Sequence, residues 1–323
     1  MPTPLLDNRQ LGGDVQRPNL LVNGGFENWQ RGTSFSTSGQ WAADRWQLSI
    51  GGSSTITISR ATAAESGSGG YAVVGAYTHG AAGNYAYLEQ SLTTEILPQI
   101  KGKTVSLSVR AYGGVNYAPG CAQVALTSSG AASNIDARGT MTTVGPQTLT
   151  ATATVPSDAT GLVIRLFWVN ISSTTYWDNA SLVVGSVPAA ADPQGWQPMH
   201  PADDLARCKR YYQRWQSGQG NTYLGVGSAQ SATVGYAMFG PWPVTLAVTP
   251  TLTISAAADF VVVNKSLATS WPVTGVTMPV PYASLAGPIL LSMTIGTSSL
   301  TPGDQIYFVA NTTTAWLALE ANP

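Results

Sequence analysis

The stretch TVSLSVRAY, residues 104–112, decides the fold class of this chain. Its odd-numbered residues are aliphatic, whereas its even-numbered residues are polar or, at Tyr112, aromatic. A strict period of two is typical of an antiparallel strand with one buried face. The stretches STITIS (54–59) and TLTATATV (148–155) alternate in the same way. The sequence therefore predicts an all-β fold.

The stretch LVIRLFWV, residues 162–169, is apolar on both faces. A strand of this kind is expected in the centre of a β-sandwich. Glycine-rich breaks such as ESGSGG and AYGG separate the strand candidates from one another. Residues 19–187 are therefore predicted to form a jelly-roll β-sandwich.

A proline- and alanine-rich stretch, SVPAAADPQGWQPMHPADD (186–204), follows and is typical of a linker. It runs into DDLARCKRYYQRW (203–215), which predicts a helix whose first carboxylates suit the helix dipole. Its expected apolar stripe consists of Leu205, Cys208, Tyr212 and Trp215, and a second face carries Arg207, Arg210 and Arg214. Two roles remain open for these arginines: solvation or pairing with acidic neighbours, and contact with a subunit or an anionic glycan.

The last part of the chain returns to strand patterns. Short candidates such as DFVVVN (259–264), PILLSMTIG (288–296) and DQIYFVAN (304–311) are separated by Pro, Gly and Asn. Residues 218–323 are therefore predicted to form a second, smaller β-sandwich, and residues 188–217 the linker and helix between the two domains.

Composition narrows the functional classes. Of the 323 residues only 10% are charged, and the net charge is −1, which leaves no electrostatic footprint for duplex nucleic acid. No apolar run reaches the length of a membrane span, and the opening MPTPLLDNRQ lacks the features of a secretion signal. Cys121 and Cys208 are expected to be buried free thiols, with a disulfide as the alternative.

Three segments, in the same order, resemble carbohydrate-binding modules of the family 4/9 type. They are NLLVNGGFE (19–27), YAYLEQSLTTEILPQIKGKTVSLSVRAYG (85–113) and YWDNASLVV (176–184). The resemblance implies a galactose-binding-like jelly roll. In its opening strand, Gly24 and Gly25 allow a tight turn, and Phe26 is expected to enter the core.

The same resemblance implies a structural calcium ion. In that family, the glutamate that follows the phenylalanine of the opening strand and the aspartate of the closing strand often hold the ion together. These two positions correspond to Glu27 and Asp178 here. Carboxylate oxygens are the ligands that calcium prefers, but Gly25 stands where the family often has an aspartate. The alternative is that Glu27 and Asp178 accept hydrogen bonds from loop amides.

A second resemblance concerns virion proteins of tailed bacteriophages, namely tail or head fibres. It rests on WQRGTSF (29–35) followed by ADRW (43–46), on LARCKRYYQRW (205–215), on PWPVTLAVTPTLTI (241–254) and on AWLALEA (315–321). This resemblance implies a structural virion protein.

Within these motifs, Trp29, Arg31, Asp44, Arg45 and Trp46 are expected to lock a loop by packing. In such a cluster a guanidinium stacks on an indole and pairs with a carboxylate. A ligand site is the alternative.

The sequence carries no catalytic motif. The two histidines, His79 and His200, stand in loop-like contexts, and no HExxH, G-x-S-x-G or P-loop pattern is present. We therefore expect no enzymatic activity; a hidden polysaccharide depolymerase is the alternative.

Aromatic and polar residues near the predicted rim of the first domain are candidates for glycan binding. They are Tyr85, Tyr87, Arg110, Tyr112, Asn116 and Tyr117. Sugar rings stack on aromatic side chains, and neighbouring polar groups fix their hydroxyls. The same tyrosines are equally compatible with packing over a sheet or with contacts between protomers.

These observations favour a fibre or spike subunit of a tailed phage that contacts host surface glycans. Residues 1–18 would attach it to other virion proteins of the capsid or tail, and it would be made in the host cytoplasm. It is expected to form a homo-oligomer, with a trimer as the usual form of phage fibres. The alternative is a free carbohydrate-binding, lectin-like adhesin.

Overall fold

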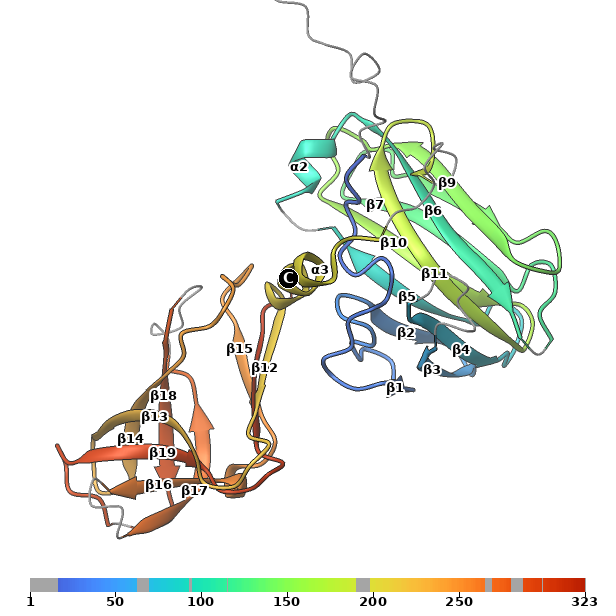
Figure 1. Cartoon of the computed structure of the whole chain (residues 1–323). Coiled ribbons are helices and arrows are strands. Elements are labelled where there is room, and N and C mark those ends of the chain that lie inside the picture. The colour runs from blue at the N-terminus through green and yellow to red at the C-terminus, as the bar shows by residue number, and fades with distance from the viewer. Residues whose placement is uncertain are drawn as a thin grey trace, which may run out of the picture. The chain divides into compact units, whose positions relative to one another are not determined.

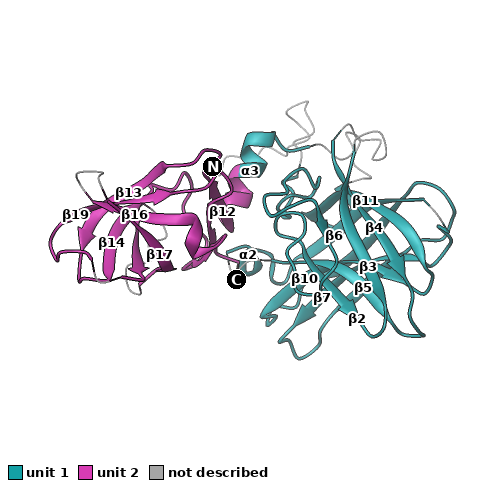
Figure 2. Cartoon of the chain, turned by 90° about the horizontal axis from the view of Figure 1, so that it is seen from below, with its two compact units in different colours: residues 1–205 teal, residues 206–323 magenta. Residues whose placement is uncertain are grey.

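The computed structural model describes residues 17–62, 70–92, 95–114, 116–189, 198–264, 269–279, 287–297 and 299–322. The chain divides into two compact units, residues 1–205 and 206–323 (Figure 2). Both are built from antiparallel strands, and the predicted all-β fold is confirmed. The boundary between the units falls inside the predicted linker region.

Unit 1 is a sandwich of two sheets (Figure 1). The six-stranded sheet has the order β1 (Ser34–Phe35), β3 (Thr55–Ala61), β4 (Ala72–Thr78), β11 (Ser173–Val184), β6 (Thr104–Gly113) and β9 (Gln147–Thr154). The five-stranded sheet has the order β2 (Gln47–Gly51), β5 (Tyr85–Ser91), β10 (Gly161–Val169), β7 (Ala122–Ser129) and β8 (Asp136–Thr140). A single short helix, α2 (Leu97–Ile100), lies among the described residues of this sandwich.

Strand β10 is the central strand of the five-stranded sheet, as its apolar sequence predicts. Its inward residue Trp168 is fully buried and packs edge-on against Trp177 of β11, with ring centroids 5.8 Å apart. A Cβ on Gly75 of β4 would lie only 2.4 Å from the Trp168 ring. The two sheets therefore approach closely because β4 has no side chain at position 75.

The opening loop is organised by the side chain of Asn23, which is fully buried with φ 54°. Its Nδ2 donates to the carbonyl oxygens of Asn28 and Asp44, and its Oδ1 accepts the Asn28 N–H. The Asn23 carbonyl accepts the Trp46 indole N–H at 3.0 Å. Phe26 is buried in the core, as expected, and a Cβ on Gly24 would lie 2.1 Å from the Ala180 carbonyl oxygen.

The predicted packing of the loop cluster is confirmed, although a different indole takes part. Arg31 pairs with the buried Asp44 at 3.4 Å. The guanidinium groups of Arg31 and Arg45 both lie over the ring of Trp41, at 5.8 Å from its centroid. Trp46 is fully buried and packs instead against Phe26.

Unit 2 contains a closed barrel and a small sheet. The barrel has the order β13 (Thr222–Ala229), β14 (Val234–Phe239), β18 (Ile289–Ile295), β17 (Ser270–Thr277), β16 (Phe260–Asn264) and β19 (Gln305–Ala310). The sheet has the order β12 (Tyr212–Gln216), β20 (Trp316–Glu320) and β15 (Thr251–Ile254). A 3-10 helix, η3 (Ala257–Asp259), precedes β16. The predicted all-β structure of this part is confirmed, but its larger sheet is a closed barrel and not one layer of the expected second β-sandwich. Strand alternation does not specify whether a sheet closes on itself.

The predicted helix over residues 203–215 is wrong in its second half. Helix α3 spans Pro201–Lys209, and Tyr212–Gln216 form β12, which pairs antiparallel with β20. Tyr212 and Trp215 are therefore not part of the predicted apolar stripe of the helix. Arg214 likewise does not lie on a helical face with Arg207. Pairing with a strand far along the sequence outweighs the local period of 3.6, which short-range patterns cannot reveal.

Three further expectations concern the cysteines, the N-terminal segment and membrane-spanning helices. Cys121 and Cys208 are both buried thiols that form no disulfide, as expected. Residues 1–16 of the predicted attachment arm lie outside the described residues; Arg17 donates to the Val184 carbonyl. No helix in the described part of the chain is long and apolar enough to cross a membrane.

The close approach at Gly75 yields a stability prediction. Gly75→Ala should lower the free energy of unfolding of unit 1 by about 1–3 kcal/mol, because the new methyl group overlaps the Trp168 ring. The matched control is Gly275→Ala in β17, where the nearest side-chain atoms lie 4.0 Å away and the effect should stay within about 1 kcal/mol. Urea unfolding followed by circular dichroism measures both, and equal effects would contradict the packing argument.

Candidate functional site

The outer face of the five-stranded sheet carries an aromatic cluster. Alternation along β10 sends Leu166 and Trp168 into the core and Phe167 to the outside. The register places Tyr87 of β5 opposite Phe167, and Tyr85 opposite Val169. Ala125, Phe167 and Val169, with Tyr87 against them, form an apolar cluster separate from the core. Neighbouring strands thus bring three aromatic rings together on one surface.

The rings of this aromatic face are arranged as a platform. Tyr85 and Tyr87 stack with their centroids 5.5 Å apart and their planes 17° from parallel. Phe167 meets both rings edge-on, at 6.2 Å from Tyr85 and 5.1 Å from Tyr87. Tyr85 is 37% exposed, whereas Phe167 is 7% exposed. Phe167 therefore supports two tyrosine rings that remain accessible.

Two arginines flank the aromatic face, and each is paired. Arg165 lies over the Tyr87 ring at 5.1 Å and donates to Glu89 at 2.9 Å. Arg138 of β8 lies over Phe167 at 5.4 Å and makes two 3.0 Å hydrogen bonds to Asp136. Each guanidinium is thus neutralised by a carboxylate, and the face presents hydrogen-bonding groups with no net charge from these two pairs.

This surface is hollowed. A depression of about 530 Å³ is lined by the aromatic face together with Asn84, Gln123, Arg138, Arg165 and Asn170. Its volume is within the range of small-molecule and sugar sites. Amide groups at its border can both donate and accept hydrogen bonds.

Gly51 of β2 makes room for this arrangement. It lies opposite Tyr85 in the strand register, and a Cβ at this position would lie 2.7 Å from the Tyr85 ring. The tyrosine ring therefore rests on the backbone of β2. A larger residue at position 51 would displace it from the stack with Tyr87.

The other predicted glycan-binding residues lie elsewhere in unit 1. Arg110 and Tyr112 share the outer face of the six-stranded sheet, where Arg110 lies over the Tyr112 ring at 5.7 Å. Tyr112 is 9% exposed and stacks on Tyr176 of the neighbouring strand at 4.8 Å. The predicted set is therefore divided between two opposite faces of the sandwich.

Asn116 and Tyr117 occupy a turn beyond β6. Asn116 is exposed with φ 55°, a conformation that asparagine tolerates. Tyr117 belongs to the hydrophobic core, and its ring covers Gly113, where a Cβ would lie 1.7 Å away. Burial, with a smaller contribution from Cys121, raises the pKa of the Tyr117 hydroxyl. This tyrosine is a packing residue.

Sequence reasoning missed Phe167, Arg165, Arg138 and Gln123. The signal for Phe167 was present, because LVIRLFWV is apolar on both faces although only one face of its sheet meets the core. The other three residues stand on β10, β7 and β8, and only the strand register brings these strands together with β5 in one sheet. Their contribution cannot be found without the pairing of the strands.

Glu27 and Asp178, the predicted calcium ligands, both engage backbone amides. The Tyr71 N–H donates to the Glu27 carboxylate at 3.0 Å, and the Asn179 N–H donates to Asp178 Oδ1 at 2.8 Å. Across the described residues, no group of three or more His, Cys, Asp or Glu side chains could hold a metal ion. The calcium ion stays a prediction.

Asp204 of α3 lies near Glu27 and completes the opening loop. Its carboxylate accepts the Asn23 N–H at 3.0 Å and the Asn28 side-chain amide at 2.8 Å. Desolvation, together with the charge of Asp204, raises the pKa of Glu27 against the opposing hydrogen bond from Tyr71. The folded protein thus disfavours the ionised form of Glu27.

Comparison with known proteins gives structural neighbours only. No family model matches the chain, and no curated protein matches its sequence. One similar solved structure is the family 22 carbohydrate-binding module and family 10 xylanase modules of Clostridium thermocellum Xyn10B with xylohexaose (12% identity, TM-score 0.33, 44% of this chain, 26% of that one). Another is the C-terminal family 22 module of the same enzyme (19% identity, TM-score 0.35, 50% and 99%). A third is the enzymatically active domain of tailspike protein 4 of bacteriophage CBA120 (17% identity, TM-score 0.33, 52% and 21%).

The raised pKa of Glu27 yields a pH prediction. A carboxyl with a raised folded-state pKa stabilises the fold below its unfolded value and loses that contribution as the pH rises through the folded value. Glu27→Gln keeps an acceptor for Tyr71 and removes the charge, so between about pH 4 and pH 7 it should gain stability relative to wild type. Thermal melts across this range measure the difference.

The same melts test the calcium prediction. If Glu27 holds an ion, added calcium should raise the melting temperature of wild type, EDTA should abolish the rise, and Glu27→Gln should show neither effect. Indifference of both proteins to calcium would leave only the hydrogen-bonding role.

For the pH prediction, the contradicting result is a difference in melting temperature between wild type and Glu27→Gln that stays constant at all pH values.

Proposed function

We propose that unit 1 binds a neutral glycan chain on the aromatic face of its five-stranded sheet. The observation that carries this proposal is the accessible Tyr85–Tyr87 stack supported by Phe167. The C–H faces of pyranose rings pack against such aromatic surfaces. Two tyrosines at alternate positions of one strand offer adjacent platforms, which suits an extended chain of sugars.

The polar groups around the aromatic face support a neutral ligand. Arg165 pairs with Glu89, and Arg138 pairs with Asp136. Because each positive charge is paired with a carboxylate, neither guanidinium favours an anionic ligand. Their remaining N–H groups, with Gln123 and Asn84, are placed to hydrogen-bond sugar hydroxyls along the depression.

We further propose that the chain works as a fibre or spike subunit of a phage virion, where glycan binding brings the particle to its host. This part rests on the sequence resemblance and on the polar segment 1–18 as attachment arm. The competing function is a free carbohydrate-binding adhesin. The same proposal includes a homo-oligomer, for which a trimer is the first expectation. It also includes the absence of catalytic activity.

Glycan binding is tested with a panel of neutral polysaccharides in affinity electrophoresis. Tyr85→Ala/Tyr87→Ala should weaken binding about tenfold or more, because both stacking surfaces are removed. Tyr71→Ala is the matched control, since Tyr71 is also 37% exposed and also lies beneath an arginine, Arg60. Retarded migration that persists in the double variant would place the sugar elsewhere.

Gly51→Val provides an independent variant on the neighbouring strand. It leaves both tyrosines in the sequence but removes the space beneath Tyr85. Binding should fall while the melting temperature changes little, because the displaced ring moves into solvent. Unchanged affinity in a folded Gly51→Val protein would show that the stack is not the binding surface.

The virion assignment is tested by deleting residues 1–18. The truncated chain should fold and retain glycan binding but no longer join phage particles. Incorporation equal to that of the full chain would refute the attachment arm. Failure of this experiment leaves glycan binding untouched, because the two assays share no readout.

A further inference from the structure

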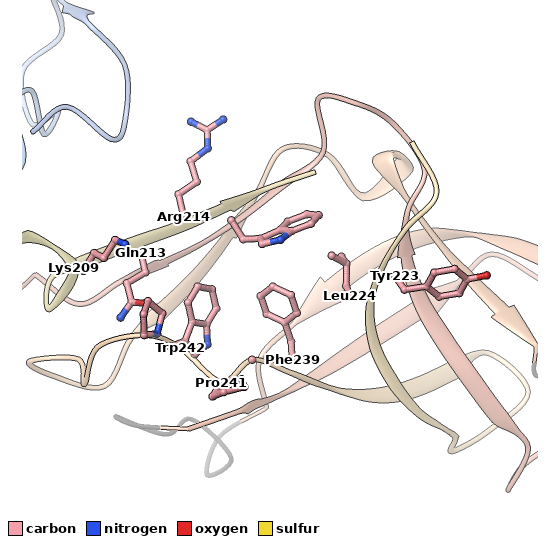
Figure 3. Close-up of a pocket in the computed structure, with 11 residues that line it drawn as sticks. Lys209, Gln213, Arg214, Tyr223, Leu224, Phe239, Pro241 and Trp242 are labelled. Carbon is pink, nitrogen blue, oxygen red and sulfur yellow. The ribbon is translucent and has the colours of Figure 1, made fainter. Parts of the chain in front are cut away.

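Unit 2 contains a pocket of about 360 Å³ that the proposed function does not use. Its walls come from the end of α3, from β12, from the start of β13, from the end of β14 and from residues 240–243 (Figure 3). The volume is at the lower end of small-molecule sites. We propose that this pocket binds a sugar residue bearing a carboxylate, such as a hexuronic acid.

Aromatic rings form one wall of this pocket. Phe239 meets Trp215 edge-on at 6.0 Å and Trp242 edge-on at 5.2 Å. Figure 3 shows the rings of Phe239 and Trp242 next to each other, with Gln213 on the other side of Trp242. Phe239 is nearly buried, whereas both indoles are partly exposed. Indole faces accessible from a pocket are suitable surfaces for the C–H groups of a sugar ring.

Three buried polar atoms of the residues that line this pocket lack a hydrogen-bond partner among the described residues: Gln213 Oε1, Trp242 Nε1 and Arg214 Nε. Gln213 is 2% exposed, and its Nε2 donates to the Val244 carbonyl at 2.6 Å. This bond fixes the amide so that Oε1 is the unpaired acceptor, and Trp242 Nε1 is an unpaired donor. A buried polar group without a partner is costly and rare. Two ligand hydroxyls would satisfy two of these atoms, one by donating to Gln213 Oε1 and the other by accepting from Trp242 Nε1.

The charge of the pocket is positive. Lys209, at the end of α3, lines it close to Gln213, and its lining residues include no Asp or Glu. Arg214 also borders the pocket, but its guanidinium points away from the rings in Figure 3 and lies over Trp316 at 4.7 Å. Lys209 is therefore the cation available to a bound carboxylate. This distinguishes the pocket from the aromatic face of unit 1, where both arginines are paired.

Together these groups define the ligand. A ring with an apolar face packs against the indoles, one hydroxyl donates to Gln213 Oε1, another accepts from Trp242 Nε1, and a carboxylate pairs with Lys209. A simple fatty acid would leave Gln213 Oε1 and Trp242 Nε1 unpaired, and a neutral hexose would leave the lysine unmatched. An anionic sugar uses all of them.

The experiment is a titration of the full chain with glucuronate and with glucose, followed by saturation-transfer NMR. Glucuronate should bind at millimolar concentrations and about tenfold or more tightly than glucose. Lys209→Met should reduce the affinity for glucuronate to that for glucose. Trp242→Phe, which keeps a ring but removes the N–H donor, should weaken both sugars.

Controls separate this pocket from the first site and from general effects. Lys101→Met and Trp271→Phe alter the same residue types elsewhere and should leave glucuronate binding unchanged. The double variant Tyr85→Ala/Tyr87→Ala should also bind glucuronate as wild type does. No binding of glucuronate, equal binding of glucose, or loss of binding in the Tyr85/Tyr87 variant would each overturn the proposal. Circular dichroism establishes that every variant is folded.

Discussion

Strand β10 has to accommodate apolar side chains on both of its faces, and much of unit 1 depends on how it does so. Its inward residues fill the sandwich core, where Trp168 reaches across to the backbone of Gly75. Its outward residue Phe167 is covered by the tyrosines of β5 and by the guanidinium of Arg138. Covering one apolar ring with amphipathic ones creates a surface that remains both aromatic and accessible. The candidate binding face thus forms where the outward apolar residues of β10 are covered by side chains of the neighbouring strands.

The opening loop and helix α3 impose a second constraint. The side chain of Asn23 hydrogen-bonds to three backbone groups of the loop, and its carbonyl accepts the Trp46 indole N–H. Asp204 of the helix accepts hydrogen bonds from the same loop. A segment just after residue 18 and a segment near residue 204 are therefore fixed to each other. This explains why the opening motif is rich in Asn and Gly: it requires a left-handed backbone at Asn23 and a close backbone approach at Gly24.

Strand alternation predicted most of unit 1, because a half-buried sheet repeats its pattern within a few residues. Alternation within a strand could not show which of the candidate glycan-binding residues lie close together. Tyr85 and Arg110 both stand on alternating strands, yet they lie on opposite sides of the sandwich. Tyr117 resembled a rim residue, although the absence of a side chain at Gly113 lets it enter the core. The predicted helix does not continue beyond Lys209 because β12 pairs with β20, which lies about a hundred residues further along the chain. Long-range pairing, and not local propensity, decides these positions.

The central claim is that a neutral glycan contacts the stacked tyrosines of β5. The most direct measurement is fluorine NMR of the protein labelled with 3-fluorotyrosine, titrated with a neutral oligosaccharide. The account predicts saturable shifts for the resonances of Tyr85 and Tyr87, assigned by single Phe substitutions, with no change at Tyr112, Tyr117 or Tyr176. Shifts confined to Tyr112 and Tyr176 would move the site to the six-stranded sheet, and the absence of any shift at saturating sugar would contradict glycan binding by unit 1.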